Sequence, residues 1–373
     1  MKKGILFVFC VCMLGFLSAQ DQYFFERDFS KYVLEANGSF GKIFKHTASF
    51  DPDVTAFTYN FEAGFSVRNF GDKPWQQKLH YPEVGATFIH SFFGDKAVFG
   101  TANGVYAHAK FWFNRNKIAD TYFRVGSGLA WLDKPYHPND NSTNNVIGSK
   151  LNNITQLKFG ADFHVHERVD LALAFTFTHY SNAKTQSPNL GINIPALTLG
   201  VRYSPFTQDR QYTYSDTLPS PEKRNEYNYQ FSVGTTNKTV GGAKFPIYVH
   251  SFYYSRYTSV ANKVWVGASW TTDMQEHDKL LFAEETDKLK FRSSDLSLFV
   301  ADEILLGKTS IYFLLGAYLI DKEFRGAPIY AKLGVNYYYL DFGKHNHKLF
   351  VGVNMKTHYS IAQYMTLSTG ISF

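Results

Sequence analysis

Apolar and polar residues alternate with a period of two along most of the chain. Within 309–320, every second position from Ile311 to Leu319 is apolar, and the positions between them are mixed. The segment 197–203 alternates in the same way. Successive side chains of a β-strand point to opposite faces, so this period predicts strands with one apolar face. No long segment shows the i, i+3, i+4 spacing of an amphipathic helix, so the predicted fold class is all-β.

The alternating segments predict about sixteen strands. Their approximate cores are 32–44, 54–69, 82–92, 97–113, 120–132, 154–166, 169–181, 195–206, 226–236, 245–258, 262–271, 293–303, 308–320, 328–341, 347–357 and 361–373. Most have the length of about ten residues that a tilted strand needs to cross a bilayer. Short turns alternate with long polar loops, as in bacterial outer-membrane barrels. The prediction is an antiparallel up-and-down transmembrane β-barrel of about 14–16 strands, because one or two weak segments can fail to form strands.

One connection does not fit a single uniform barrel. The segment 207–225 is long, polar and charged where a short periplasmic turn is expected. It can be a linker or long turn between a first β-barrel region, 20–206, and a C-terminal region of strands, 226–373. One large barrel and two eight-strand halves both remain open, and the single assembly signal at the C-terminus favours one barrel.

The N-terminus predicts export. Two lysines precede a mostly apolar run over 5–17, and small residues follow it, with a cleavage site after Ala19. This is the pattern of a secretory signal peptide over 1–19. The apolar run is too short to cross a bilayer as a helix.

The C-terminus predicts insertion into the bacterial outer membrane. Alternate positions from Met365 to Phe373 are mostly apolar, and the chain ends on that phenylalanine. Such an ending resembles the signal that outer-membrane proteins present to the barrel-assembly machinery, which is therefore a predicted partner through Phe373.

The composition supports a membrane barrel and excludes several other classes. Aromatic residues make up 18%, with 25 Tyr and 36 Phe, and transmembrane barrels place such residues in girdles at both interfaces. Without the two lysines of the signal peptide, the formal charge falls from +6 to +4, which is too mild to predict nucleic-acid binding. Both cysteines, Cys10 and Cys12, lie in the signal peptide, so the mature chain has no thiol chemistry.

Candidate chemistry lies at the end of the strand 169–181. Its odd positions from Leu171 to Phe177 are apolar and are predicted to face lipid; His179 and Ser181 continue that row. Residues i and i+2 of a strand share a face, and a histidine beside a serine is the minimal activated nucleophile. The strand is predicted to run outward, so the pair would reach the depth of outer-leaflet acyl esters. The alternative is a pair of polar residues at the membrane interface without catalytic function.

A wider motif favours catalysis. The run His-Tyr-Ser-Asn-Ala at 179–183, followed by Pro-Asn-x-Gly-Ile at 188–192, resembles the PagL-type lipid A 3-O-deacylase family, outer-membrane barrels related in name to acyloxyacyl hydrolases. The resemblance is specific over about fifteen residues and looser over 20–206, where the strand pattern and the Gly-Ser pair at 148–149 are also similar. It implies hydrolysis of an ester-linked acyl chain on lipid A or lipopolysaccharide, with no metal and no cofactor.

The resemblance also implies residue roles. His179 matches the general base and Ser181 the nucleophile, while Asn182 and Asn189 match motif amides that can donate hydrogen bonds to an oxyanion. The family's third catalytic residue is a glutamate twelve residues after the nucleophile, and this chain has Asn193 there. An amide can orient a histidine but cannot stabilise the imidazolium by charge. The chain is therefore predicted to be either a His/Ser/Asn variant or a weakened enzyme.

Other motifs carry weaker hypotheses. The tetrapeptide 357–360 repeats the Thr-His-Tyr-Ser of the site, but the strand register places His358 and Ser360 in the row facing the lumen. His164 and His166 share a strand face, but no third metal ligand is evident. The competing functional hypothesis is a non-catalytic porin-like or structural outer-membrane barrel with a degenerate deacylase motif.

Overall fold

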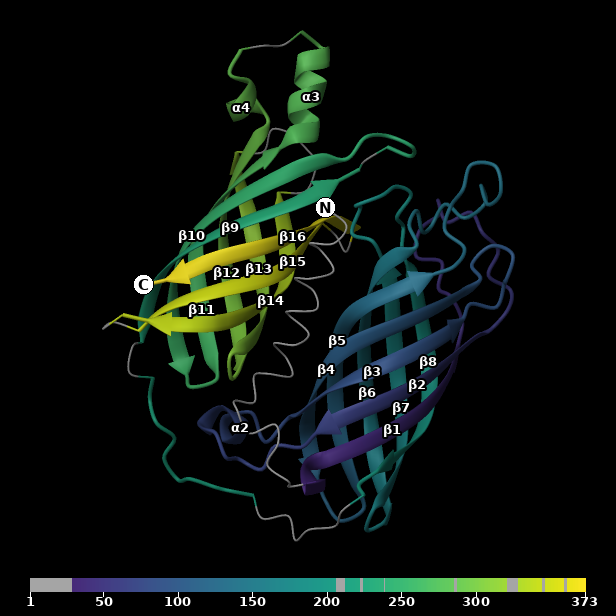
Figure 1. Ribbon diagram of the computed structural model, residues 1–373, viewed down its shortest axis with the longest axis vertical. Helices are drawn as coiled ribbons and strands as arrows, with labels where there is room; N and C mark the ends of the chain where they lie inside the picture. Colours follow the sequence, from purple (N-terminus) through teal and green to yellow (C-terminus); the bar gives the residue numbers. More distant parts are fainter. Residues whose placement is uncertain are drawn as a thin grey trace. The chain divides into compact units, whose positions relative to one another are not determined.

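In the computed structural model, sixteen antiparallel strands form two closed barrels of eight strands each (Figure 1). The structure describes residues 29–205, 212–221, 224–237, 239–284, 287–320, 328–343, 346–358 and 361–373. The predicted signal peptide 1–19 lies outside the described residues. The predicted all-β, antiparallel barrel fold is confirmed, and the preference for one large barrel is wrong.

The first barrel contains strands β1–β8. Their bounds are β1 Tyr32–Gly41, β2 Thr58–Val67, β3 Glu83–Phe92, β4 Thr101–Arg115, β5 Ala119–Leu132, β6 Leu151–His166, β7 Val169–Ser181 and β8 Ile192–Tyr203. A 3-10 turn, η1 Phe29–Lys31, precedes β1, and a short helix, α2 Pro74–Lys78, lies between β2 and β3. The barrel closes because β1 pairs with β8, from Leu34 opposite Tyr203 to Gly41 opposite Ala196.

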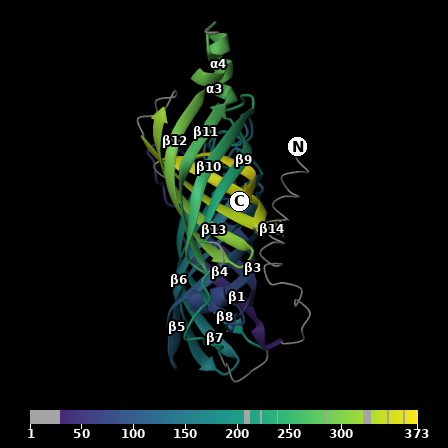
Figure 2. The same cartoon turned by 90° about the vertical axis from the view of Figure 1, so that its left-hand side faces the viewer.

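The second barrel contains strands β9–β16. Their bounds are β9 Asn225–Thr236, β10 Phe245–Ser259, β11 Asn262–Asp273, β12 Ser294–Leu306, β13 Thr309–Ile320, β14 Ile329–Phe342, β15 His347–His358 and β16 Ile361–Ser372. It closes between β9 and β16, and the backbone of Phe373 extends this pairing with a 2.8 Å hydrogen bond to Tyr227. Two helices, α3 Met274–Phe282 and α4 Leu289–Arg292, stand beyond the ends of β11 and β12 (Figures 1 and 2). No helix in the described ranges is long and apolar enough to cross a membrane.

Barrel number depends on contacts that the alternation pattern does not encode. Consecutive strands pair with each other, as a hairpin pattern predicts, except for β8 and β9, and closure depends on which distant strand pairs with β1. In the structure β8 returns to β1, so the chain closes once before β9 begins. The C-terminal pattern identifies only the last strand of the chain. It therefore carries no information on how many barrels the strands form.

The wall of the first barrel has the predicted alternation. On β7, Leu171, Leu173 and Phe175 are 47%, 46% and 50% exposed, whereas Ala172 and Ala174 between them are buried. The apolar row therefore faces out of the barrel, as expected for a wall in contact with lipid.

The lumen of the first barrel is filled by side chains. In one half, Arg124 and Arg202 bind Glu35 at 2.8 and 3.1 Å, and Lys158 binds Glu62. At the end that carries the connections 42–57, 93–100, 133–150 and 182–191, here called the long-loop end, the lumen holds a cluster of buried apolar residues. This cluster supports the wall from inside.

The lumen of the second barrel combines ion pairs with stacked aromatic rings. Lys263 binds Glu226 at 2.9 Å, and the rings of Tyr253 and Trp265 lie 4.6 Å apart. His358 also lies inside, where its Nε2 shares a 2.9 Å hydrogen bond with the Tyr318 hydroxyl. Its orientation agrees with the predicted register of the repeated motif; Ser360 lies outside the described residues.

Candidate active site

The predicted site residues meet where β7 ends and β8 begins. His179 on β7 is the direct cross-strand partner of Asn193 on β8, and Ser181 lies two residues beyond His179 in the same outward-pointing row, where it is 2% exposed. Tyr180 between them points the opposite way, is fully buried, and shares a 2.7 Å hydrogen bond with Ser91. The inward tyrosine therefore fixes the strand that presents the outward pair.

Ser181, His179 and Asn193 form a continuous series of hydrogen bonds. Nε2 of His179 lies 2.9 Å from the Ser181 Oγ, and its Nδ1 lies 2.6 Å from the Asn193 Oδ1. If Nδ1 donates to the amide oxygen, Nε2 has a free lone pair that accepts the serine proton. The arrangement can thus activate a serine hydroxyl, with an amide in the position of the usual acid.

The loop after Ser181 is held by two asparagines with different environments. The backbone N–H of Asn182 donates to the Asn189 Oδ1 at 2.8 Å. The Nδ2 of Asn182 donates to the Ser149 Oγ and the Gln186 carbonyl at 2.9 and 2.8 Å, so both of its hydrogens are engaged. Within the described residues, no group accepts a hydrogen bond from the Nδ2 of Asn189. The bond from the backbone of Asn182 sets the orientation of the Asn189 side chain. The geometry therefore favours Asn189 over Asn182 as an oxyanion donor.

Gly191 allows the loop to pass against the ring of His179. Its φ is +84°, which favours glycine, and a Cβ there would lie 2.7 Å from the Cε1 of His179. We expect Gly191→Ala to push the imidazole out of line with Ser181 and lower kcat by about 10²-fold, the cost of a displacement of about 1 Å. Steady-state kinetics on the folded variant would measure this. An unchanged kcat would mean that activity does not depend on the position of the His179 ring.

A row of polar residues that the sequence motif does not include lies beside the site. Asn153 and Thr155 on β6 are the cross-strand partners of Ser181 and His179, and Asn153 donates to Ser127 on β5 at 2.9 Å. These side chains interrupt an outward row that is otherwise apolar, from Leu151 to Phe159. That interruption can be recognised in the sequence, because polar groups on a lipid-facing row are unexpected.

His46 is a second neighbour of the site that could not be predicted from the sequence. Its Nδ1 lies 3.0 Å from the Nδ2 of Asn193, on the side opposite His179. The residue lies in the 42–57 connection, 147 positions before Asn193. No local pattern in the sequence links the two.

The histidines considered as metal ligands lie at the end of β6, beside the start of β7 and away from the candidate site. His164 is held between Asp170 at 2.8 Å and Asp120 at 3.2 Å, and His166 accepts from the backbone of Arg168 at 3.2 Å. Within the described ranges no group of three or more His, Cys, Asp or Glu residues has metal-binding geometry.

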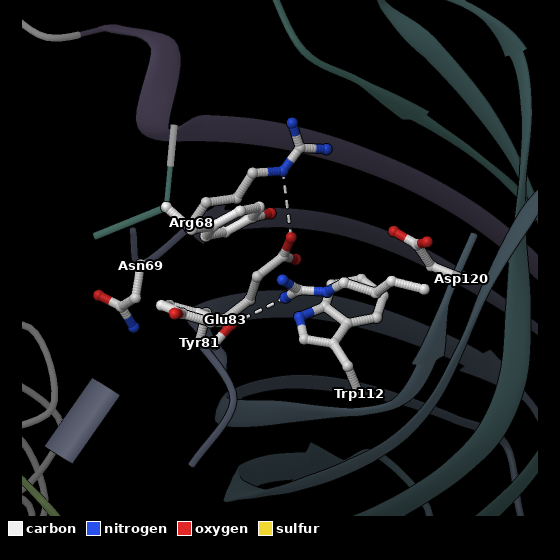
Figure 3. Close-up of a pocket in the computed structure, with 8 residues that line it drawn as sticks. Arg68, Asn69, Tyr81, Glu83, Trp112 and Asp120 are labelled. Carbon is white, nitrogen blue, oxygen red and sulfur yellow. Dashed lines mark hydrogen bonds and ion pairs between the residues drawn. The ribbon is translucent and has the colours of Figure 1, made fainter. Parts of the chain in front are cut away.

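A pocket also opens at the end of the first barrel opposite the long loops (Figure 3). It is lined by Arg68, Asn69, Tyr81, Glu83, Trp112, Arg115, Asp120 and Tyr212. Arg68 binds Glu83 at 3.1 Å, and Arg115 donates to the Tyr81 carbonyl at 3.0 Å. The pocket contains none of the predicted site residues, so it belongs to the ion-paired half of the lumen and not to the candidate active site.

Comparisons with known structures find several outer-membrane proteins. The crystal structure of the outer membrane enzyme PagL is 16% identical, and the match covers 44% of this chain and 97% of that chain with a TM-score of 0.33. Neisserial surface protein A is 13% identical over 47% of this chain and 97% of its own, also with a TM-score of 0.33. A mutant of the Rh. blastica porin is 10% identical over 92% and 100%, with a TM-score of 0.19. A comparison with curated proteins found no match.

Comparisons with family models are more informative. The model of lipid A 3-O-deacylase (PagL) matches residues 30–202, which include the whole candidate site. The model of the acyloxyacyl hydrolase C-terminal domain matches residues 225–373. Together the two models span most of the chain, and the protein belongs to the PagL-type lipid A 3-O-deacylase family, with an acyloxyacyl hydrolase C-terminal domain.

Proposed function

We propose that the protein is an outer-membrane hydrolase that removes an ester-linked acyl chain from lipid A by a Ser/His mechanism. The observation that carries the proposal is the hydrogen-bonded series Ser181–His179–Asn193 on the outer face of the wall. The acyl chains of lipid A stay in the membrane, so a nucleophile that acts on their esters must be reached from the lipid side. The family match supports lipid A as the substrate class.

Acylation requires two proton transfers and the exchange of one ester bond for another. The Ser181 Oγ attacks the ester carbonyl carbon while its proton passes to the Nε2 of His179. The tetrahedral intermediate then collapses, the bond from the carbonyl carbon to the sugar oxygen breaks, and His179 returns the proton to that oxygen. The acyl chain remains on Ser181 as an ester.

Deacylation repeats these steps with water as the nucleophile. His179 takes a proton from water, the hydroxide attacks the acyl-serine, and the free fatty acid leaves as Ser181 regains its proton. Asn193 accepts from Nδ1 throughout, which keeps the imidazole in the tautomer that the chemistry needs.

Asn189 is the proposed oxyanion donor. We expect Asn189→Ala to lower kcat by about 10²–10³-fold with a small change in KM, because a donor to the oxyanion acts mainly in the transition state. Asn182→Ala should act differently, since Asn182 holds the loop through Ser149 and Gln186. Equal, small effects of both variants on kcat would remove Asn189 from this role.

The regions of the chain have separate proposed roles. Residues 1–19 would direct export, 20–206 would form the catalytic barrel, and 207–225 would link it to the strands of 226–373. Long loops of bacterial barrels face the exterior, so the long-loop end would place the site at the level of the outer leaflet. Phe373 would serve recognition by the barrel-assembly machinery.

A channel is the competing function, and the first barrel argues against it. Its lumen is crossed by buried ion pairs at one end and by buried apolar side chains at the other, whereas a porin encloses a water-filled channel.

Incubation of the purified full chain with lipid A in detergent micelles tests the two functions. We expect mass spectrometry to show loss of one acyl chain and the appearance of a free fatty acid. Unchanged lipid A, together with conductance in planar bilayers, would reject the deacylase and support the channel.

A further inference from the structure

We propose that His46 is a positioning residue that fixes the amide orientation of Asn193 and, through it, the tautomer of His179. This inference rests on the proposed function for its kinetic consequences. The hydrogen-bond geometry on which it stands is independent of the substrate.

An asparagine in the acid position creates an ambiguity that a glutamate does not have. Both oxygens of a carboxylate accept hydrogen bonds, whereas an amide has one acceptor and one donor group of similar shape. If the Asn193 side chain flipped, its Nδ2 would face the Nδ1 of His179. That nitrogen would then have to accept, and the ring proton would move to Nε2, where it would block proton transfer from Ser181.

The carbonyl of Leu190 removes the ambiguity. A carbonyl oxygen only accepts, and it lies 3.1 Å from the Nε2 of His46, so that nitrogen carries the proton. The neutral ring then has its lone pair on Nδ1, which accepts from the Asn193 Nδ2 at 3.0 Å. The amide oxygen is thereby turned toward the Nδ1 of His179, 2.6 Å away.

The direction of every hydrogen bond in the series follows from that anchor. His179 donates through Nδ1 to Asn193, and its Nε2 is left to accept from the Ser181 hydroxyl at 2.9 Å. The Leu190 carbonyl therefore determines which group donates and which accepts in each of four successive hydrogen bonds. A His46 protonated on both nitrogens could not accept from Asn193 and would break the series.

The surrounding contacts hold His46 in place. The backbone N–H of Phe44 donates to the Asn193 carbonyl at 2.8 Å, which ties the 42–57 connection to β8. The edge of the imidazole packs against the ring of Phe50, with 6.1 Å between the ring centroids, and Phe50 is itself buried. Leu190 and Gly191 are adjacent, so one loop contacts both His46 and the catalytic ring.

The kinetic test compares His46 variants in two backgrounds. We expect His46→Ala to lower kcat by about 10–100-fold with little change in KM, because a fraction of molecules would hold the wrong tautomer. His46→Asn offers an acceptor near the Nδ1 position and should recover part of the loss. In an Asn193→Glu background the loss on His46→Ala should shrink to about threefold or less, because a carboxylate has no wrong orientation. His137→Ala, which alters an exposed histidine of the 133–150 loop, is the matched control.

Two kinetic results would overturn the inference. One is an unchanged kcat on His46→Ala; the other is an equal loss in both backgrounds, which would mean that His46 only supports the loop.

Nitrogen NMR of the ¹⁵N-histidine-labelled full chain in micelles gives a readout without substrate. The expected result is protonation of His179 at Nδ1 in the unaltered chain and a mixture of tautomers in His46→Ala. If lipid A is not cleaved but the tautomer still depends on His46, the proposed function fails and the positioning role stands. If cleavage occurs but the tautomer does not respond, the positioning role fails alone.

Discussion

Ser181→Ala is expected to abolish release of acyl chains from lipid A, with a fall in kcat on the order of 10⁶-fold. Ser181 supplies the attacking oxygen, and in serine hydrolases removal of the nucleophile or of the base costs about that factor. His179→Ala should cost a similar factor, and the double variant little more, because the two residues act as one unit. Mass spectrometry of lipid A from cells carrying each variant, combined with rates on purified protein, measures the effect.

The matched control for this experiment is Ser142→Ala. Ser142 is an exposed serine in the 133–150 loop at the same end of the barrel, so its removal should leave the acylation pattern as in the unaltered chain. Heat-dependent mobility in gels would establish that each variant has folded as a barrel. Identical lipid A from the unaltered chain, Ser181→Ala and His179→Ala would eliminate the esterase mechanism.

Replacement of Asn193 gives the second large effect. Asn193→Leu should lower kcat/KM by about 10⁴-fold, the cost of the wrong histidine tautomer in a serine protease triad, because no acceptor then faces the His179 Nδ1. Asn193→Glu should keep or raise activity, because a carboxylate accepts the same hydrogen bond and also stabilises the imidazolium formed during catalysis.

Comparison of kcat/KM for the two Asn193 variants tests the assignment. Complete inactivity of a folded Asn193→Glu would mean that the family's acid position does not map onto residue 193. Full activity of Asn193→Leu would mean that His179 needs no partner at Nδ1.

Local features of the structure could be predicted from the sequence, because alternation is a property of neighbouring residues. All sixteen predicted segments correspond to strands, and the alternation on β7 placed His179 and Ser181 on the outer face. The number of barrels could not be predicted, because it depends on pairing between strands as distant as β1 and β8.

The candidate site also has one part that could be predicted from the sequence and one part that could not. The motif brought together His179, Ser181 and Asn193, which are close in sequence and become neighbours across one hairpin. His46 reaches the site only through closure of β1 onto β8, so no spacing rule could find it. The difference between Asn182 and Asn189 also needed coordinates, because it depends on which amide hydrogens are already engaged.

The proposed function requires a serine of the lipid-facing wall that is activated by a neighbouring histidine. The most direct test is covalent labelling of the folded full chain in lipid vesicles with a long-chain alkyl fluorophosphonate, followed by mass spectrometry of peptides. We expect one adduct, on Ser181, which forms at least about 10²-fold more slowly in His179→Ala. A folded chain that leaves Ser181 unlabelled, or labels it equally fast without His179, would contradict the activation of Ser181 by His179.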